Sequence, residues 1–250
     1  MTLAWETIAT ATTASGPLEL RRRGEKDFLI TLRGRVLMSS AAHRSEDALA
    51  KLACAGLQKK RRAHVLVSGL GMGFTLRAAL TELPADAIVV VAELNAVVVE
   101  WCEGPLGALT GNAARDPRVT VEIADVARTL KSVADDEGAR RFDAIVLDMY
   151  EGPQTVVRPN DTLYGPLAVQ RAKKALAPGG VFAVWCEAPS VGFERSLRSA
   201  GFQYTLEREG RGARTHQVYL ARDVERPPRG TPRGASEAPK RPAPARKRRM

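Results

Sequence analysis

Acidic residues follow several apolar runs of the sequence, at positions where a strand would end. Glu93 closes one run, and Asp125 and Asp148 directly follow the next two. In an open parallel sheet, ligands bind beyond the carboxyl ends of the strands. Carboxylates gathered there could accept hydrogen bonds from ribose hydroxyls, bind an ammonium group or accept its proton. An acid at such a position can also be a helix N-cap, and for Asp125 the sequence leaves both interpretations open.

A glycine-rich turn precedes these acids. Gly69, Gly71 and Gly73 follow the apolar run 65–67, and a helical pattern comes after them. Glycines let a ligand approach the backbone without meeting a Cβ, and the helix start offers free N–H groups. Glu93 lies twenty residues beyond Gly73, a spacing that places a carboxylate at the ribose of a bound nucleotide. We therefore predict a nucleotide site, against the alternative of a tight turn in an ordinary α/β sheet.

The elements that position these residues can be inferred from periodicity. From residue 63 onward, apolar strand-like runs alternate with helical patterns, which predicts a parallel sheet with helices on both faces. After a turn at 177–180, the run 181–186 predicts a strand, and two final strand-like runs, 202–207 and 218–221, predict a hairpin. A parallel sheet that ends in a hairpin indicates a fold for one nucleotide, with a seventh, antiparallel strand.

The ends of the chain differ from this middle part. Short runs of alternating polarity predict a small antiparallel sheet in 1–42, and Ser45 is the predicted N-cap of the helix that follows. Residues 43–224 form the predicted nucleotide-binding domain. Residues 225–250 are rich in proline, arginine and lysine without an aromatic residue, which predicts a disordered basic tail.

Composition is that of a water-soluble globular protein. The chain has 250 residues, of which 44% are hydrophobic and 26% charged. Most of the net charge of +10 lies in the tail, so the rest of the chain offers no strong argument for a phosphate-binding surface. The segment 1–20 has no signal-peptide pattern, and no apolar run approaches the roughly 18 residues of a membrane span. We expect a cytoplasmic protein without membrane contact.

The three cysteines, Cys54, Cys102 and Cys186, lie far apart and form no CxxC pair. This spacing favours small buried side chains over metal ligands or disulfides.

Four segments resemble motifs of the spermidine synthase family of aminopropyltransferases. They are Ala92-Glu93-Leu94-Asn95, Ile123-Ala124-Asp125, Leu147-Asp148-Met149-Tyr150-Glu151-Gly152-Pro153 and Leu163-Tyr164-Gly165-Pro166. The similarity covers roughly residues 27–207. That family is built on the class I S-adenosylmethionine methyltransferase fold. The resemblance therefore implies an α/β, Rossmann-like seven-stranded sheet of this type with a small N-terminal antiparallel β extension.

The resemblance also implies a transferase of polyamine biosynthesis. Such an enzyme moves an aminopropyl group from decarboxylated S-adenosylmethionine, a sulfonium donor, to an amine. By resemblance, the glycine turn and Glu93 would hold the donor, with Glu93 on the ribose, and Asp125 would contact the adenine amino group. Asp148 and Glu151 would hold the reacting amine.

The chemistry of amine alkylation adds roles to this picture. A free amine has a pKa near 10 and is mostly charged at neutral pH, so a carboxylate must bind it and accept its proton. Asp148 is the predicted proton acceptor, with Glu151 and Tyr150 as further catalytic candidates. Tyr164 is predicted to bind substrate, because it and Tyr150 could line an apolar wall or stack on a cation. We expect S-adenosylmethionine or its decarboxylated form as co-substrate, and no metal.

Other interpretations stay open. Met72 stands where the family has an aspartate that contacts the aminopropyl amine, which favours an S-adenosylmethionine-dependent methyltransferase of unknown acceptor. His43 is an alternative base, although a histidine at a helix start is commonly a cap. A protein of another class, a non-catalytic nucleotide- or RNA-associated protein, would bind nucleic acid weakly through the basic tail. The amphipathic N-terminal strands could also pair between subunits and form a homodimer.

Overall fold

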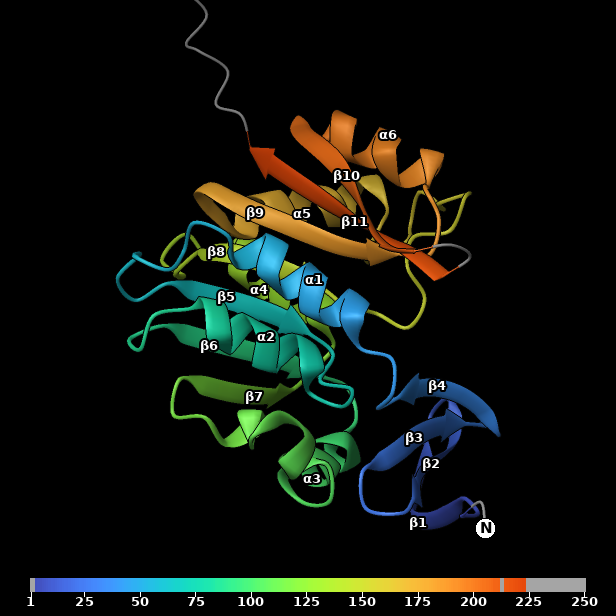
Figure 1. Ribbon diagram of the computed structural model, residues 1–250. Helices are drawn as coiled ribbons and strands as arrows, with labels where there is room; N and C mark the ends of the chain where they lie inside the picture. Colours follow the sequence, from blue (N-terminus) through green and yellow to red (C-terminus); the bar gives the residue numbers. More distant parts are fainter. Residues whose placement is uncertain (1–2, 212–213, 224–250) are drawn as a thin grey trace, which may run out of the picture.

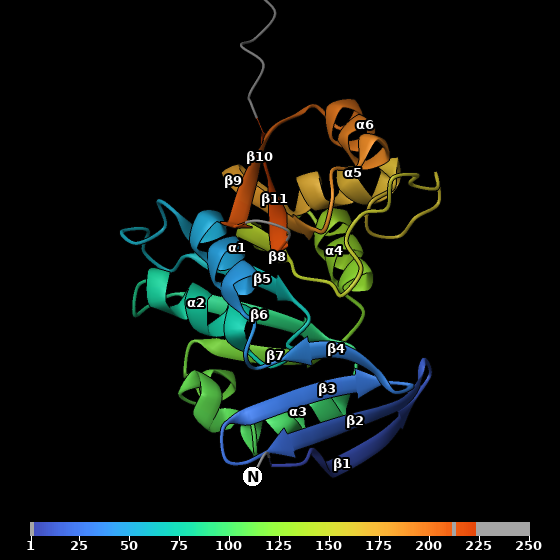
Figure 2. The same cartoon turned by 45° about the vertical axis from the view of Figure 1, so that its right-hand side comes forward.

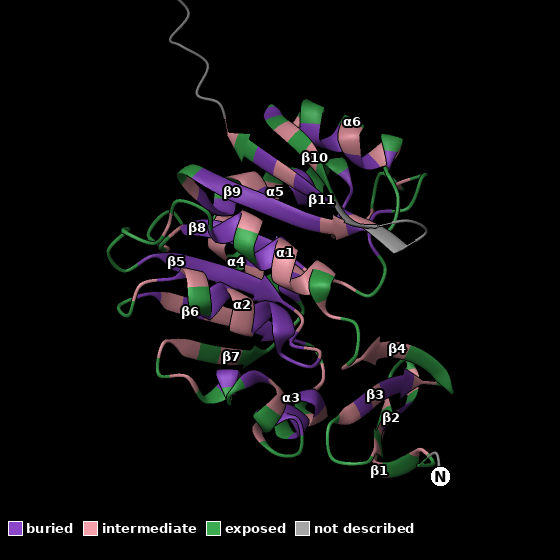
Figure 3. Ribbon diagram, in the orientation of Figure 1, coloured by how far each residue is buried: buried purple, intermediate pink, exposed green. Residues whose placement is uncertain are grey.

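The central strand β5 (His64–Ser68) is buried along its whole length. In this computed structural model, which describes residues 3–211 and 214–223, its side chains enter two separate cores. Val65 and Val67 point to one face of the sheet and Leu66 to the other, as the alternation of a strand requires. The apolar run Val65 to Val67 is thus explained, because both faces of this strand are covered by other parts of the protein. Figure 3 shows β5, β8 and β9 as the most continuously buried strands.

The main sheet has seven strands in the order β10-β11-β9-β8-β5-β6-β7. Strands β5, β6, β7, β8 and β9 are parallel, and β11 is antiparallel to both β9 and β10. The remaining bounds are β6 Ile88–Glu93, β7 Val119–Ile123, β8 Phe142–Leu147, β9 Leu176–Cys186, β10 Phe202–Arg211 and β11 Arg214–Asp223. The predicted α/β fold with a seventh, antiparallel strand is confirmed.

Helices cover both faces of this sheet (Figures 1 and 2). One core includes residues of α1 (Arg44–Cys54), α2 (Phe74–Glu82) and α3 (Ala96–Glu103). The opposite core includes residues of α4 (Val126–Asp135), α5 (Pro166–Ala175) and α6 (Val191–Ser199). Two short 3-10 helices, η1 (Gly107–Thr110) and η2 (Ala113–Arg115), connect α3 to β7.

A second, four-stranded antiparallel sheet forms the N-terminal part of the described chain. Its strands follow one another in the order β1 (Glu6–Thr13), β2 (Gly16–Arg23), β3 (Asp27–Leu32) and β4 (Arg35–Ser39). Four buried side chains of this sheet belong to the same core cluster as Val65: Leu18, Leu20, Phe28 and Ile30. Figure 1 shows the sheet on the side toward which the arrowheads of β5, β6 and β7 point.

Two local predictions are wrong. Ser45 is not the N-cap of α1, because the helix begins at Arg44 with His43 in the cap position, and the Ser45 hydroxyl bonds to Glu46 Oε2 at 2.6 Å. The strand predicted from Val181 begins earlier, because β9 continues through the turn residues from Leu176, with Gly179 at φ +73°.

Three further predictions concern the tail, the cysteines and membrane contact. The basic tail 225–250 lies outside the described residues. All three cysteines are buried with free thiols, and burial raises the pKa of each to about 12. In the part of the chain that the structure describes, no helix is long and apolar enough to cross a membrane.

Candidate active site

The glycine turn between β5 and α2 needs glycine for conformation and for space. Gly69, Gly71 and Gly73 have φ values of +72°, +53° and +83°, in the region that side chains rarely adopt. A Cβ on Gly69 would lie 3.2 Å from the carbonyl oxygen of Asp148, and one on Gly71 would lie 2.5 Å from Met38 Cε of β4. The turn is therefore held between the end of β8 and the N-terminal sheet.

Glu93 binds this turn through its side chain. Its Oε2 accepts the Leu70 N–H and its Oε1 accepts the Asn95 N–H, both at 2.8 Å, and the residue is 6% exposed. Two hydrogen bonds from backbone N–H groups provide this buried carboxylate with polar partners. The acid at the end of β6 thus lies against the glycine turn, as its place in the sequence predicts.

Asp125 is a helix cap. Its Oδ1 accepts the Ala127 N–H at 2.9 Å, at the start of α4, and its side chain is exposed. The backbone places it near Glu93, because the Ala124 N–H donates to the Glu93 carbonyl at 2.9 Å. Of the two interpretations left open by the sequence, the structure thus contains the cap. The adenine contact stays a prediction.

Asp148 lies beside the glycine turn at the end of β8. Its backbone N–H donates to Ser68 Oγ at 3.1 Å, and its Oδ2 accepts a hydrogen bond from the Thr75 hydroxyl in the first turn of α2. The pKa of Asp148 is raised to about 7, because burial disfavours the charged carboxylate and the nearby negative charge of Glu46 adds to this. The Thr75 hydrogen bond acts in the opposite direction. The carboxyl group therefore changes protonation near neutral pH.

The loop after Asp148 does not bring all of its predicted residues inward. Tyr150 is 57% exposed, and the Glu151 side chain is exposed as well. Glu151 contributes its backbone carbonyl, which accepts a hydrogen bond from the Tyr164 hydroxyl at 3.1 Å. Gly152 lies against β9, where a Cβ would be 2.8 Å from the Trp185 carbonyl oxygen. Only glycine fits at this point of the loop.

Tyr164 is the buried aromatic residue of the site. It is 6% exposed, and its ring lies edge-on to Phe193 with centroids 5.6 Å apart. Burial raises the pKa of its hydroxyl, and nearby acids including Asp161 and Asp148 add to the effect. Tyr164 therefore stays neutral and holds the loop backbone through its hydroxyl.

His43 does not cap α1 with its side chain. Its Nδ1 lies 2.8 Å from Asp47 Oδ2, and its ring stacks on Phe74 with centroids 4.3 Å apart. Asp47 also accepts a hydrogen bond from Arg77 of α2 at 2.7 Å. This group ties the start of α1 to the start of α2.

Two residues that act on Asp148 were not among the sequence candidates, namely Thr75, which contacts it, and Glu46, whose charge raises its pKa. Thr75 follows the glycine turn closely, so its position two residues after Gly73 is a signal that could have found it. Glu46 lies about a hundred residues before Asp148 in the chain, and no local pattern connects the two.

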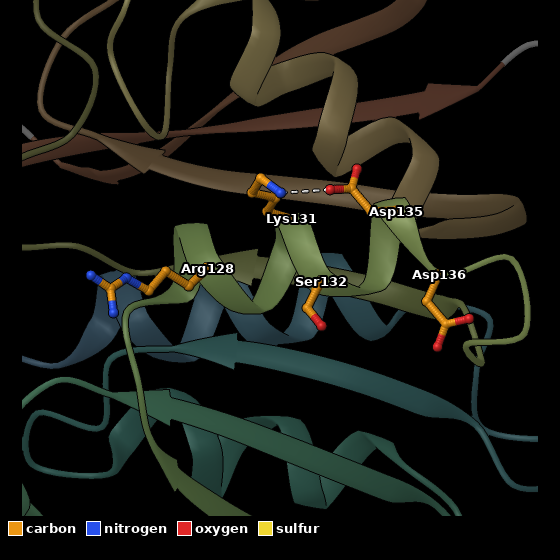
Figure 4. Close-up of a pocket in the computed structure, with 5 residues that line it drawn as sticks. All are labelled: Arg128, Lys131, Ser132, Asp135 and Asp136. Atoms are coloured by element: carbon orange, nitrogen blue, oxygen red, sulfur yellow. Dashed lines mark hydrogen bonds and ion pairs between the residues drawn. The ribbon is translucent and has the colours of Figure 1, made fainter.

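A surface hollow lies elsewhere on the molecule. It measures about 460 Å³. It is lined by four residues of α4 and by the residue that follows the helix: Arg128, Lys131, Ser132, Asp135 and Asp136. Figure 4 shows these side chains along the outer surface of α4, with Lys131 paired to Asp135 at 2.7 Å. None of the strand-end carboxylates lines it, so we do not assign it to the site.

Comparison with solved structures defines the class of fold. The chain is similar to spermidine synthase from Thermotoga maritima, with a TM-score of 0.66 and 19% identity over 87% of this chain and 73% of that one. It is also similar to human methyltransferase-like protein 13 in complex with SAH, with a TM-score of 0.53 and 19% identity over 73% and 81%. The fold is thus that of spermidine synthases and methyltransferases.

Sequence comparison then identifies the family. The model of the spermine/spermidine synthase domain matches residues 46–196, which is more than half of the chain, and the protein belongs to this family. A curated relative, polyamine aminopropyltransferase from Klebsiella pneumoniae (strain 342), is 30% identical over 119 residues. That match covers 48% of this chain and 38% of the relative, so the chain spans well under half the length of this relative.

Proposed function

We propose that this protein is an aminopropyltransferase that moves an aminopropyl group from decarboxylated S-adenosylmethionine to an amine. The observation that carries the proposal is Asp148, a carboxyl group beside the glycine turn with a pKa of about 7. Membership of the spermine/spermidine synthase domain family supports the reaction class. The similarity to a polyamine aminopropyltransferase supports a polyamine or diamine acceptor.

The donor would bind at the turn. Positive φ at Gly69, Gly71 and Gly73 lets the backbone approach a nucleoside closely, and the start of α2 offers N–H groups. Glu93, at the neighbouring strand end, would accept the ribose hydroxyls with lone pairs that its two backbone contacts leave free. Asp125 would reach the adenine amino group with Oδ2, because Oδ1 caps α4.

The acceptor reacts as a free amine. Ionised Asp148 binds the ammonium group and takes one proton, which leaves a nitrogen lone pair. That lone pair forms a bond to the carbon next to the sulfonium sulfur. The carbon–sulfur bond breaks, its electron pair stays on sulfur, and a neutral thioether leaves. Because little covalent chemistry falls to the protein, its main contribution is to align the two substrates.

Tyr150, Glu151 and Tyr164 would complete the acceptor side. Tyr164 holds the loop backbone, so it would shape the pocket wall. The exposed Tyr150 and Glu151 would contact a second amino group of a long acceptor at the entrance to the site.

Methyl transfer from S-adenosylmethionine is the second candidate, and the position of Met72 favours it. Met72 occupies the place of the family's amine-binding aspartate and is 1% exposed. A buried thioether side chain offers no charge to the donor's ammonium group. Loss of that contact removes one determinant for the decarboxylated donor.

The deciding experiment is calorimetric titration with S-adenosylmethionine and with its decarboxylated form, followed by a product assay with putrescine. Tighter binding of the decarboxylated donor and formation of spermidine would support aminopropyl transfer. Preference for S-adenosylmethionine would support the methyltransferase, and binding of neither would reject the donor site at Gly69–Gly73.

Three broader expectations accompany the proposal. Light scattering would test a homodimer formed through the N-terminal strands. Deletion of residues 225–250 would test whether the tail binds nucleic acid, and fractionation of cells would test the expected cytoplasmic location.

A further inference from the structure

Asp148 is contacted by a hydroxyl from outside the strand-end motifs. Thr75 lies in the first turn of α2, is 3% exposed, and donates its hydroxyl hydrogen to Asp148 Oδ2. Because Thr75 is buried, water hardly competes for this contact. A hydrogen bond donated to a carboxylate stabilises its ionised form and fixes the direction of the group.

Glu46 belongs to α1, the other helix that begins at this edge, and its negative charge is near enough to raise the pKa of Asp148. Figures 1 and 2 show the starts of α1 and α2 and the end of β5 at the same edge of the sheet. The Asp47–Arg77 ion pair and the stacking of His43 on Phe74 hold the two helix starts together. Glu46 is half-buried in the first turn of α1, and Ser45 Oγ donates to its Oε2 at 2.6 Å.

The two neighbours have opposite electrostatic effects. The negative charge of Glu46 raises the pKa of Asp148, in addition to the larger effect of burial, and the Thr75 hydroxyl lowers it. Tyr164 is another titratable group whose pKa Asp148 raises, and it stays neutral over the working range. A base is most effective when it changes protonation near the working pH.

We propose that Thr75 and Glu46 are positioning residues that act on Asp148 in opposite directions and together prepare it to accept the proton of the amine substrate. The inference rests on the proposed function, in which Asp148 accepts the proton of the amine. Thr75 keeps one carboxylate oxygen in a fixed place and favours the ionised group. Glu46 keeps that group basic enough to remove a proton.

The test is a pair of variants with opposite expected results. Thr75→Val keeps the shape of the side chain and removes the hydroxyl, so the titration midpoint of Asp148 moves to higher pH. Glu46→Gln removes a negative charge, so the midpoint moves to lower pH. Both are measured on the full-length protein from the ¹³C shift of the Asp148 carboxyl carbon, assigned by its loss in Asp148→Asn. The acidic limb of the pH profile of kcat/KM with putrescine moves in the same directions.

Matched controls separate this effect from general damage to α2. Thr81→Val and Glu82→Gln make the same chemical changes at the far end of the helix, and both leave the midpoint unchanged. Thr75→Ser retains the hydroxyl and restores the midpoint. Circular dichroism and thermal unfolding show that each variant is folded.

Several outcomes would overturn the inference. The first is a midpoint that moves in the same direction in Thr75→Val and Glu46→Gln, and the second is an unchanged midpoint in both. The third is a control variant that moves the midpoint as far as these two variants do. Because the carbon titration needs no turnover, opposite shifts without product formation would support the inference while rejecting aminopropyl transfer. Product formation with an unchanged midpoint in both variants would support aminopropyl transfer and reject the inference.

Discussion

Asp148 is the residue on which the proposed chemistry depends. Its backbone is held by Ser68 and its side chain by Thr75, so the carboxyl group has a defined place beside the glycine turn. Burial and the charge of Glu46 make its carboxyl group more basic than that of an ordinary aspartate. Glu151, three residues later, is exposed and has no comparable environment.

Replacement of Asp148 by asparagine should remove the proton acceptor and retain the side-chain shape. We expect kcat to fall by about 10²- to 10⁴-fold, as for loss of a general base. Calorimetry should show nearly unchanged donor affinity, because the donor is assigned to the turn. Glu151→Gln is the comparison variant, and a larger loss for it than for Asp148→Asn would contradict the assignment.

The raised pKa of Asp148 also predicts a pH dependence of stability. The native carboxyl group has a pKa of about 7, whereas an ordinary aspartate, as in the unfolded chain, has a pKa of 3.8. Between these values the native state holds more protons than the unfolded state, so this group's contribution to stability falls as pH rises. Asp148→Asn should remove that decline.

Denaturant unfolding of the native sequence and of Asp148→Asn at several pH values between 4 and 7 measures this difference. The gap between the two free energies of unfolding should change steadily over the range and level off above it. If the two free energies of unfolding instead change in parallel with pH, the pKa of Asp148 is not raised in the native state.

At the level of elements, the acids that end β6 and follow β8 both contact the segment that follows β5 through their side chains. Glu93 of β6 binds the turn after β5, and Asp148 after β8 binds the start of α2. Asp125 serves its own helix, α4, through Oδ1. The site is thus built from helix starts and strand ends, which explains why its residues lie far apart in the sequence.

Asp125→Ala tests the two roles of this residue separately. Loss of the cap should lower the free energy of unfolding by about 1 kcal/mol, measured by denaturant titration. If Asp125 also contacts adenine, donor affinity should fall in the same variant. Asp125→Ser restores a cap without a carboxylate, so it should recover stability and leave affinity reduced. Full recovery of both would limit Asp125 to the cap.

At the scale of the whole molecule, the N-terminal sheet and the seven-stranded sheet share one core. Leu20 and Phe28 of the small sheet belong to the cluster that contains Val65, and Met38 packs on Gly71 of the turn. Occupation of the turn by a donor should therefore stabilise both sheets together.

Thermal unfolding with and without donor measures this coupling. At a donor concentration of a hundred times Kd, binding adds about 2.7 kcal/mol, which corresponds to a rise in Tm of about 5–10 °C for a domain of this size. The transition should stay single. Two transitions, of which only one moves with donor, would show that the N-terminal sheet is independent of the site.

The order of the elements and the positions of the strand ends could be predicted from local sequence patterns. Buried strands need runs such as Val65 to Val67, and the acids Glu93 and Asp148 follow such runs directly, so local patterns sufficed. The glycine turn could also be predicted from a local pattern, because backbone positions with positive φ favour glycine.

Which side chains contact one another, in contrast, depends on how the elements pack in three dimensions. The contact of Thr75 with Asp148 joins residues 73 positions apart, and the effect of the Glu46 charge on Asp148 depends on how α1 packs beside α2. The tertiary structure also decided that Asp125 caps a helix and that Ser45 does not. The pKa of a carboxyl group depends on burial and on neighbouring charges, and both arise from packing, which sequence periodicity does not specify.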